Sequence, residues 1–316
     1  MLRAFLAHAG RHGLLPPGAR VIAALSGGAD STCLLHLLLE ARAPLGLQIE
    51  VAHVNHRLRG RAAERDAAAV ERLARRNGLP FHLGLGRPFT AAERRSASLQ
   101  ELARELRLGF LLRLARRRRA RVALAHTADD QAETLLMRML GGAGPPGLCG
   151  IPPASHGGLL VHPLLCARRA EIEAWLAERG LRWRTDRSNR SPRYLRNRVR
   201  HELLPLIARD YNPAIVGHLD RLARALRLDN DALEAEASRL LREAIATPGV
   251  RSFPAGLLDS APRAVAARAL LAALRALAPR RADFSSRHLE ALLAPGSGER
   301  SWDLPGGVSA RRDGAG

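Results

Sequence analysis

The chain contains one stretch whose residue types suit phosphate binding, formed by Ser26, Gly27, Gly28, Ala29, Asp30 and Ser31. The two glycines let the backbone approach an anion closely, and the two serines supply hydroxyl donors. Residues 20–25 (RVIAAL) are short and apolar like a buried parallel strand, and residues 32–42 are rich in helix formers. The stretch therefore lies where a strand turns into a helix, and the unpaired N–H groups of that first helical turn attract phosphate.

Asp30 adds a carboxylate to this loop. A carboxylate beside phosphates is repulsive unless a cation lies between them, so Asp30 is a predicted Mg²⁺ ligand. The loop is not the familiar Walker P-loop, because no Gly-Lys-Ser/Thr follows its glycines. An ordinary glycine-rich turn capped by serine is the alternative. The complete hexapeptide between a strand and a helix favours nucleotide binding.

A second stretch with acid–base groups is HTADDQAET, residues 126–134, which begins at a strand end and continues into a helix. Asp130 and Glu133 are three residues apart and share one helix face, and His126 precedes them in the loop. This arrangement suits binding an ammonium group and taking a proton from it. The alternative is capping, because Asp129, Asp130 and Glu133 also suit the positive end of a helix.

Strands and helices alternate over residues 20–180, which predicts an α/β fold with a doubly wound parallel sheet. Ligands in such sheets bind at the carboxyl ends of the strands, where Ser26, His53 and His126 fall. The predicted strands are 20–25, 48–54, 81–85, 121–125 and 159–161. The predicted helices after the first are 62–77, 99–118, 129–140 and 168–179.

From Pro213 the pattern changes to leucines at helical spacing, with Pro248 and Pro254 as breaks between helices. Residues 301–307 (SWDLPGG) predict a short strand and turn near the end. We therefore expect a catalytic domain over residues 1–212 and a helical domain over residues 213–316 that contributes to substrate binding.

The 316 residues carry a formal net charge of +20, and every residue of the Lys+Arg count is arginine. A charge excess of this size favours a polyanionic partner, and nucleic acid is the first candidate. No apolar run suits a signal peptide or a membrane span, so we expect a cytoplasmic protein without membrane contact. The three cysteines are isolated, which gives no support to a metal knuckle, a cluster or a redox dithiol.

Three motifs, SGGADS (26–31), HVNHRLR (53–59) and HTADDQAET (126–134), resemble those of the tRNA(Ile)-lysidine synthetase family within the PP-loop, or N-type, ATP pyrophosphatases. Further matches follow in order at 101–107 (ELARELR), 141–150 (GGAGPPGLCG), 162–165 (HPLL), 183–189 (WRTDRSN) and 196–200 (RNRVR). The resemblance covers residues 20–210 best. An ordered series of this kind predicts membership of the family.

The resemblance implies a reaction in two steps. ATP adenylates O2 of the cytidine at the first anticodon position of tRNA(Ile) with a CAU anticodon, and pyrophosphate is released. The ε-amine of L-lysine then attacks C2 and displaces AMP, which gives lysidine. The implied cofactors are ATP and Mg²⁺. Homodimers occur among relatives, and the sequence leaves the oligomeric state open.

The resemblance also implies residue roles. The 26–31 loop binds the ATP phosphates, His53 lines the nucleotide pocket, and Arg107 neutralises charge in the adenylation step. His126, Asp130 and Glu133 are the expected groups for lysine binding and proton transfer. The expected lysine and tRNA contacts are Asp129, Asp186, Asn189, Arg196, Arg198 and Arg200. A solvated helix face is the alternative for the three arginines.

The chain departs from the family at Leu108, where the family usually has tyrosine, so no role is carried over for that ring. A PP-loop tRNA thiolase is one rival, and it would normally need a Cys-x-x-Cys pair that this chain lacks. An amidotransferase-type synthetase is a second, and it would need a glutaminase domain or an N-terminal nucleophilic cysteine. A non-catalytic tRNA-binding protein is the third.

Overall fold

The structure is a computed structural model of the chain. It describes residues 1–56, 60–87, 89–90, 98–184, 195–278, 282–295 and 298–313. The chain forms two compact units, Met1–Ala223 and Arg224–Gly316.

The first unit is built around a sheet. Its helices and strands are α1 (Leu2–Arg11), β1 (Arg20–Ala24), α2 (Ala29–Glu40), α3 (Arg42–Leu45), β2 (Gln48–Asn55), α4 (Arg61–Arg76), β3 (Phe81–Leu85), α6 (Leu99–Arg118), β4 (Arg121–Ala123), α7 (Ala128–Leu140), α8 (Pro145–Leu148), β5 (Ala154–Ser155), β6 (Leu160–Val161), the 3-10 turn η1 (Pro163–Cys166), α9 (Arg169–Glu178), α10 (Leu195–Arg198), the π-helical turn η3 (Val199–Leu203) and α11 (Leu204–Asp210). Helix α12 (Ile215–Glu243) begins in this unit and continues into the second.

The sheet has the strand order β3-β2-β1-β4-β6-β5. All neighbours are parallel except β5 and β6, which pair antiparallel at one edge. The chain adds strands on one side of β1 and then crosses to β4 on its other side, which leaves a crevice at the carboxyl ends of β1 and β4. The predicted doubly wound α/β fold is confirmed, and the antiparallel edge strand is an addition that the sequence pattern did not reveal.

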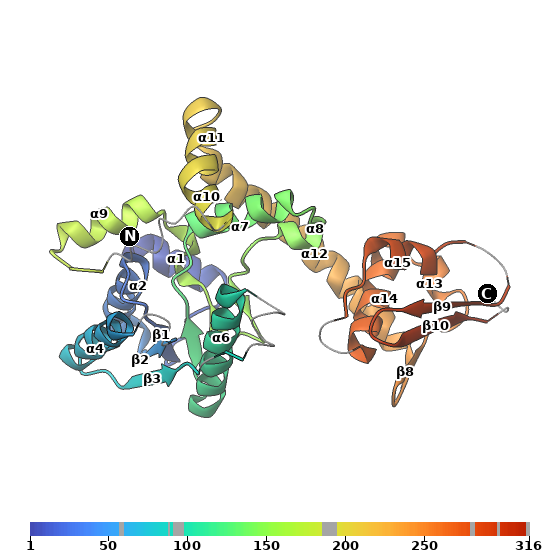
Figure 1. Cartoon of the computed structure of the whole chain (residues 1–316), viewed down its shortest axis with the longest axis horizontal. Helices are drawn as coiled ribbons and strands as arrows, with labels where there is room; N and C mark the ends of the chain where they lie inside the picture. Colours follow the sequence, from blue (N-terminus) through green and yellow to red (C-terminus); the bar gives the residue numbers. More distant parts are fainter. Residues whose placement is uncertain are drawn as a thin grey trace. The chain divides into compact units, whose positions relative to one another are not determined.

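Alternate residues of the strands face two different helix layers. Val21 and Ala23 of β1 pack in a core with α1, α2, α4 and α9, whereas Ile22 packs against Leu111 and Leu114 of α6. Figure 1 shows α6 apart from α1 and α2, beside the sheet. Both faces of β1 are therefore buried, which is why its sequence reads as a continuous apolar run.

Capping residues determine where the two helices next to the crevice begin. Ser98 accepts a hydrogen bond from the Glu101 N–H, and the Glu101 carboxylate accepts one from the Ser98 N–H, which starts α6. Thr127 and Asp130 form the same reciprocal pair at the start of α7. Two orphan N–H groups of each helix are satisfied in this way.

The second unit combines helices with two small hairpins. After α12 come β7 (Ile245–Thr247), β8 (Val250–Ser252), α13 (Leu257–Ser260), α14 (Arg263–Leu277), α15 (Ser286–Leu292), β9 (Arg300–Leu304) and β10 (Val308–Arg312). The predicted strand near residue 301 is confirmed as β9. The predicted break between helices at Pro248 is confirmed, since Pro248 lies between α12 and α13, but the sequence pattern missed the hairpin there, in which Pro248 and Gly249 form the turn between β7 and β8. A Pro-Gly pair at the centre of a tight turn explains the difference.

Among the described residues, none of the helices combines the length and the apolar composition needed to cross a membrane.

Candidate active site

The 26–31 loop follows β1 and leads into the first turn of α2. Gly27 has φ +87°, a conformation that glycine adopts at no steric cost. The Ser31 hydroxyl donates to the Gly28 carbonyl at 3.0 Å and accepts from the Ser26 N–H at 3.2 Å. These bonds hold the loop so that the first N–H groups of α2, which have no intrahelical acceptor, face the crevice.

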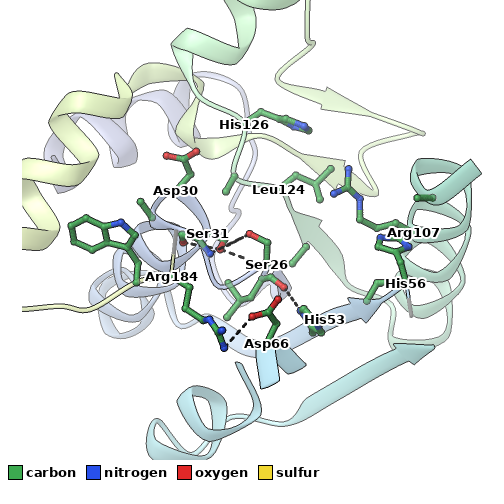
Figure 2. A pocket seen from close by; sticks show the side chains of 18 of the residues that line it. Ser26, Asp30, Ser31, His53, His56, Asp66, Arg107, Leu124, His126 and Arg184 are labelled. Carbon is green, nitrogen blue, oxygen red and sulfur yellow. Dashed lines mark hydrogen bonds and ion pairs between the residues drawn. The ribbon is translucent and has the colours of Figure 1, made fainter. Parts of the chain in front are cut away.

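A cavity of about 1000 Å³ opens over this loop. Figure 2 shows its walls: Ser26 and Asp30 from the loop, His53 and His56 from the end of β2, His126 after β4, and Arg107 from α6. All of these elements meet at the carboxyl ends of the parallel strands, as the sheet topology requires. The structure therefore brings together predicted residues from four separate stretches of the chain.

Asp30 lies at the edge of this cavity with 25% of its side chain exposed. Burial raises the pKa of its carboxyl from 3.8 to about 6, and the Arg169 guanidinium, 3.6 Å from Oδ2, partly opposes that rise. Oδ1 is buried and has no hydrogen-bond partner among the residues that the structure describes. One oxygen of Asp30 is therefore available to a cation.

His53 is held in one tautomer. Its Nδ1 lies 2.7 Å from the carbonyl oxygen of Leu25, which can only accept, so Nδ1 carries the proton and Nε2 is an acceptor. Burial lowers the pKa of the imidazole, so the ring is neutral at pH 7. His53 can thus accept a hydrogen bond from a ligand and contributes no charge.

Arg107 projects from α6 into the cavity (Figure 2) and forms no ion pair with any described residue. Partial desolvation, with Arg104 and Arg196 nearby, lowers the pKa of its guanidinium. A cation without a carboxylate partner is well suited to bind an anion that enters the cavity.

His126 also lines the cavity, and burial together with the neighbouring His162 lowers the pKa of its imidazole to about 3. The two rings have centroids 4.9 Å apart. The ring is therefore neutral at pH 7, and its buried Nδ1 has no hydrogen-bond partner within the described part of the chain.

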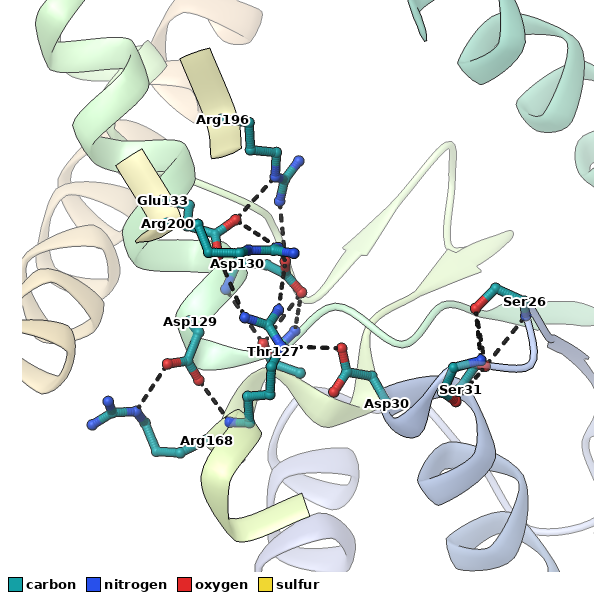
Figure 3. A network of polar contacts seen from close by, with 12 residues as sticks. Ser26, Asp30, Ser31, Thr127, Asp129, Asp130, Glu133, Arg168, Arg196 and Arg200 are labelled. Carbon is teal, nitrogen blue, oxygen red and sulfur yellow. Dashed lines mark hydrogen bonds and ion pairs between the residues drawn. The ribbon is translucent and has the colours of Figure 1, made fainter. Parts of the chain in front are cut away.

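Asp130 and Glu133 lie on one face of α7, as predicted, with relative exposures of 7% and 1%. Figure 3 shows that they belong to a network with arginines from two later segments. Arg200 makes a two-pronged contact with Glu133, at 2.6 Å to Oε1 and 2.8 Å to Oε2, and reaches Asp130 Oδ1 at 3.0 Å. Burial alone would raise the pKa of Asp130, but Arg196 and Arg169 bring it below its usual value.

Arg169, the first residue of α9, is a site residue that the sequence reasoning missed. Its guanidinium lies 3.6 Å from Asp30, 3.3 Å from Asp130 and 3.5 Å from Glu133. Its backbone N–H donates to Asp129 Oδ2 at 2.7 Å. A sequence signal did exist, since arginines at a helix start oppose the helix dipole and need a local reason.

The three arginines of the 196–200 stretch do not lie on one face. Arg196 and Arg200 turn inward to the carboxylates of α7, whereas Arg198 is exposed and lies 3.8 Å from Glu202. In a helix, residues four apart share a face and residues two apart do not. The two-residue spacing therefore places Arg198 on a different face of the helix from Arg196 and Arg200.

A π-helical turn, η3, carries Arg200 within this segment. Pro205 follows the turn and lacks the N–H that would bond to His201, which explains why the regular helical pattern is interrupted here.

A family model described as a PP-loop domain matches residues 6–207, which is more than half of the chain. This chain belongs to the PP-loop domain family. The match covers nearly all of the first unit, including the loop, the cavity and the arginine–carboxylate network of this PP-loop domain.

Two curated relatives of this PP-loop protein share a name. A tRNA(Ile)-lysidine synthase of Geobacter sulfurreducens is 44% identical over 246 residues, covering 77% of this chain and 50% of the relative. The protein of that name from Solibacter usitatus is 42% identical over 228 residues, covering 72% of this chain and 50% of the relative. The chain spans about half the length of the curated relatives it matches.

A solved structure shares the fold of the PP-loop domain. The U34-tRNA thiolase NcsA of Methanococcus maripaludis, solved with its [4Fe-4S] cluster, superposes with a TM-score of 0.57 at 20% identity. The superposition covers 70% of this chain and 77% of the thiolase chain. This likeness concerns the fold alone.

The segment after α9 reaches the PP-loop itself. The Arg184 N–H donates to the Gly27 carbonyl at 3.0 Å, and the Arg184 guanidinium lies 3.0 Å from Asp66 of α4. The next predicted contacts, Asp186 and Asn189, lie outside the described residues.

The donor set of the PP-loop domain fits Mg²⁺ through one carboxylate. Asp30 Oδ1 is the unpartnered buried oxygen of the loop, and among the described residues no group of three or more His, Cys, Asp or Glu side chains suits a metal. Mg²⁺ commonly takes one or two carboxylates and completes its shell with waters and substrate phosphates. A single aspartate beside a phosphate-binding loop agrees with that preference.

Proposed function

We propose that this chain catalyses the ATP-dependent ligation of L-lysine to C2 of the cytidine at the first position of the CAU anticodon of tRNA(Ile). The observation that carries the proposal is one cavity lined by the 26–31 loop and by Arg107, which forms no ion pair with any described residue, together with a buried carboxylate pair that contacts two arginines of the cavity wall, Arg169 and Arg200. The relatives named tRNA(Ile)-lysidine synthase support the choice of substrate.

In the first step, O2 of the cytidine forms a bond to the α-phosphorus of ATP, and the bond to pyrophosphate breaks. The N–H groups at the start of α2 bind phosphate oxygens, with Ser26 and Ser31 shaping the loop. His53 Nε2 accepts a hydrogen bond from the nucleoside part of ATP. Arg107 stabilises the negative charge that develops in the transition state.

Mg²⁺, when bound at Asp30, would neutralise charge on the phosphates. Asp30 then serves as its protein ligand through Oδ1.

In the second step, the lysine ε-nitrogen forms a bond to C2, the C2–O2 bond breaks, and O2 leaves on AMP. The attacking amine must be neutral, although its usual pKa is about 10.4, so a base has to be close. Asp130 and Glu133 hold the ammonium and take its proton, and His126, which burial keeps neutral, assists by accepting a hydrogen bond from the amine.

The tRNA supplies the polyanion that the net charge of +20 favours. Exposed arginines such as Arg198 are proposed phosphate contacts, and the second unit is proposed to extend the tRNA-binding surface. The proposal places the enzyme with its tRNA in the cytoplasm. We also propose that the protein forms a homodimer, and light scattering tests this by measuring the molar mass in solution.

A thiolase function receives no support from the cysteines. Burial raises the pKa of the Cys33 thiol to about 12 and that of Cys166 to about 11. A reactive sulfur needs the opposite shift, because the thiolate is the nucleophile.

The test is incorporation of labelled lysine into a tRNA(Ile) transcript with a CAU anticodon, with and without ATP. We expect incorporation that requires ATP and disappears when the first anticodon base is changed. The Asp130→Asn variant should lose incorporation and keep its fold, because the amide oxygen of the new side chain can still accept the hydrogen bond from the Thr127 N–H at the start of α7. Its melting temperature is the control.

Other outcomes would change the proposal in different ways. AMP release with tRNA and a nucleophile other than lysine would keep the ATP chemistry and discard lysidine. No AMP release with any tRNA would favour the non-catalytic tRNA-binding protein.

A further inference from the structure

One side chain links the phosphate-binding loop to the carboxylate pair. Arg169 contacts Asp30 on one side and both Asp130 and Glu133 on the other, at 3.3 to 3.6 Å. The Asp129 carboxylate binds its backbone N–H and fixes the start of α9, so only the side chain is free to change partners.

The carboxylates that would bind an amine are already neutralised. Three carboxylates and three guanidiniums meet here, from Asp30, Asp130, Glu133, Arg169, Arg196 and Arg200. The charges balance, so an incoming ammonium gains little attraction while all three arginines stay. Binding the amine therefore requires one arginine to leave the pair.

The distances identify the arginine that leaves most easily. Arg200 and Arg196 hold the pair at 2.6 to 3.1 Å, and Arg200 does so with two parallel bonds to Glu133 (Figure 3). The contacts of Arg169 are longer, at 3.3 Å to Asp130 and 3.5 Å to Glu133. Shorter, bidentate charge-assisted bonds are the stronger ones, so Arg169 is held least firmly.

Of the three arginines in this network, Arg169 is the one that forms an ion pair with the 26–31 loop. It contacts Asp30 within the loop and lines the cavity. Guanidinium groups bind phosphate oxygens in two-pronged fashion. Phosphates on the loop would therefore offer Arg169 a new partner on the side away from Glu133.

We propose that Arg169 is a latch that keeps Asp130 and Glu133 closed to the amine until ATP phosphates draw its guanidinium toward the loop. The amine then binds tightly only when ATP is present, which orders the two substrates. This inference rests on the proposed function, because it takes ATP and lysine as the ligands of the two sites.

A latch of this kind has a measurable coupling. ATP should tighten lysine binding by the same factor by which lysine tightens ATP binding, because coupling free energies are reciprocal. Couplings between sites usually correspond to about 5- to 150-fold. We expect an effect within that range.

The experiment measures the dissociation constant of labelled lysine by equilibrium dialysis with the full chain and tRNA(Ile) transcript. One arm contains Mg²⁺ and α,β-methylene-ATP, which cannot transfer AMP to the tRNA. The other arm omits the nucleotide. For the unchanged protein we expect at least about fivefold tighter lysine binding with the analogue. Arg169→Gln should bind lysine equally in both arms.

Arg168→Gln is the matched control, since this neighbouring arginine contacts Asp129 at 3.4 Å and should leave the coupling intact. Coupling that persists in Arg169→Gln, or that is absent from the unchanged protein, would overturn the latch. Lysine binding in either arm would still leave the proposed function standing.

The reciprocal measurement requires no variant. Saturating lysine should tighten analogue binding to the unchanged protein by the same factor, and no change would reject the latch even if Arg169→Gln fails to fold. If the analogue binds and lysine binds in neither arm, the proposed function fails and the latch with it.

Discussion

At the scale of single residues, burial determines the charge of the groups in the cavity. It raises the pKa of Asp30 to about 6 and lowers that of His126 to about 3. A carboxylate that is costly to ionise binds a cation readily, and an imidazole with a strongly lowered pKa stays neutral and accepts hydrogen bonds rather than a proton. The sequence supplies these residue types, and their surroundings decide how each one behaves.

Asp30→Asn should stabilise the protein at neutral pH. Between pH 3.8 and about 6 the native state binds more protons at Asp30 than the unfolded state, so the free energy of unfolding falls as the pH rises. Above this window the ionised carboxylate costs about 1–3 kcal/mol, which the amide avoids. Thermal unfolding should give the variant a higher melting temperature at pH 7.5 and a smaller gain at pH 5.

Glu105→Gln is the control, because Glu105 is exposed on α6 and its loss should change the melting temperature little at either pH. An Asp30→Asn gain that is equal at both pH values would contradict the role of burial.

Arg107→Gln should slow adenylation while ATP still binds. Removing one group that stabilises transition-state charge typically lowers turnover by about 10²- to 10³-fold. Single-turnover release of pyrophosphate with tRNA measures the step. Arg104→Gln, one helical turn earlier and exposed, should stay within about twofold of the unchanged rate. Equal losses in both variants would argue against a specific role for Arg107.

At the scale of elements, α7 is held in place at its first turn, both by its cap and by the chain that follows the helix. Thr127 caps its start, and the Gln131 side chain exchanges hydrogen bonds with the backbone N–H and carbonyl of Ile151. Because α7 carries Asp130 and Glu133, the loop that follows α7 positions these two side chains when it holds the helix in place. The matched motif at 141–150 therefore has a structural role.

Gly150→Ala should destabilise the protein and reduce activity. Gly150 has φ +65°, and a Cβ there would lie 2.6 Å from Leu135 Cδ1 and 2.7 Å from Gln131 Cδ. The strained backbone and the displaced α7 together should cost about 2–4 kcal/mol. Thermal unfolding and lysine incorporation measure the two effects.

Gly157→Ala separates backbone strain from crowding. Gly157 has φ +66° and nothing within 4 Å of the position of a Cβ, so only the backbone cost of about 1 kcal/mol applies. Similar losses in both variants would show that contact with α7 contributes little.

At the scale of the whole chain, α12 contributes to the cores of both units. Val216, Leu219 and Ala223 pack in a core with Leu135 and Leu136 of α7. Farther along, α12 contributes to a core of the second unit. The boundary between the compact units lies at Ala223, within the helix, whereas the sequence pattern already changes at Pro213. We propose that the first unit needs the opening turns of α12 to fold.

Two shortened chains test that proposal. Residues 1–227 keep Val216 and Leu219, whereas residues 1–212 lose both, which removes about 3–6 kcal/mol of apolar burial. The shorter chain should melt about 10 °C lower or be insoluble, since 1 kcal/mol corresponds to about 2–4 °C at this size. Circular dichroism on heating measures this. Equal melting temperatures would place the boundary at residue 212.

The sequence by itself determined the parallel α/β fold and the residues most able to do chemistry. Apolar runs define buried strands, and Gly27 and Gly28 at a strand end define a loop of the kind that suits phosphate binding. These features depend on neighbours in the chain, so local patterns reveal them. The β7–β8 hairpin was missed because Pro248 and Gly249 interrupt a helix and form a tight turn equally well.

Only the tertiary structure decided which charges meet. Arg169, Arg196 and Arg200 are 36 or more residues away from Glu133 in sequence, and the fold brings them to it at 2.6 to 3.5 Å. Ion pairing depends on distance in space, which the spacing of arginines along the chain does not encode. A row of basic residues that suited an exposed tRNA surface thus divides between one exposed arginine and two that hold the buried carboxylates.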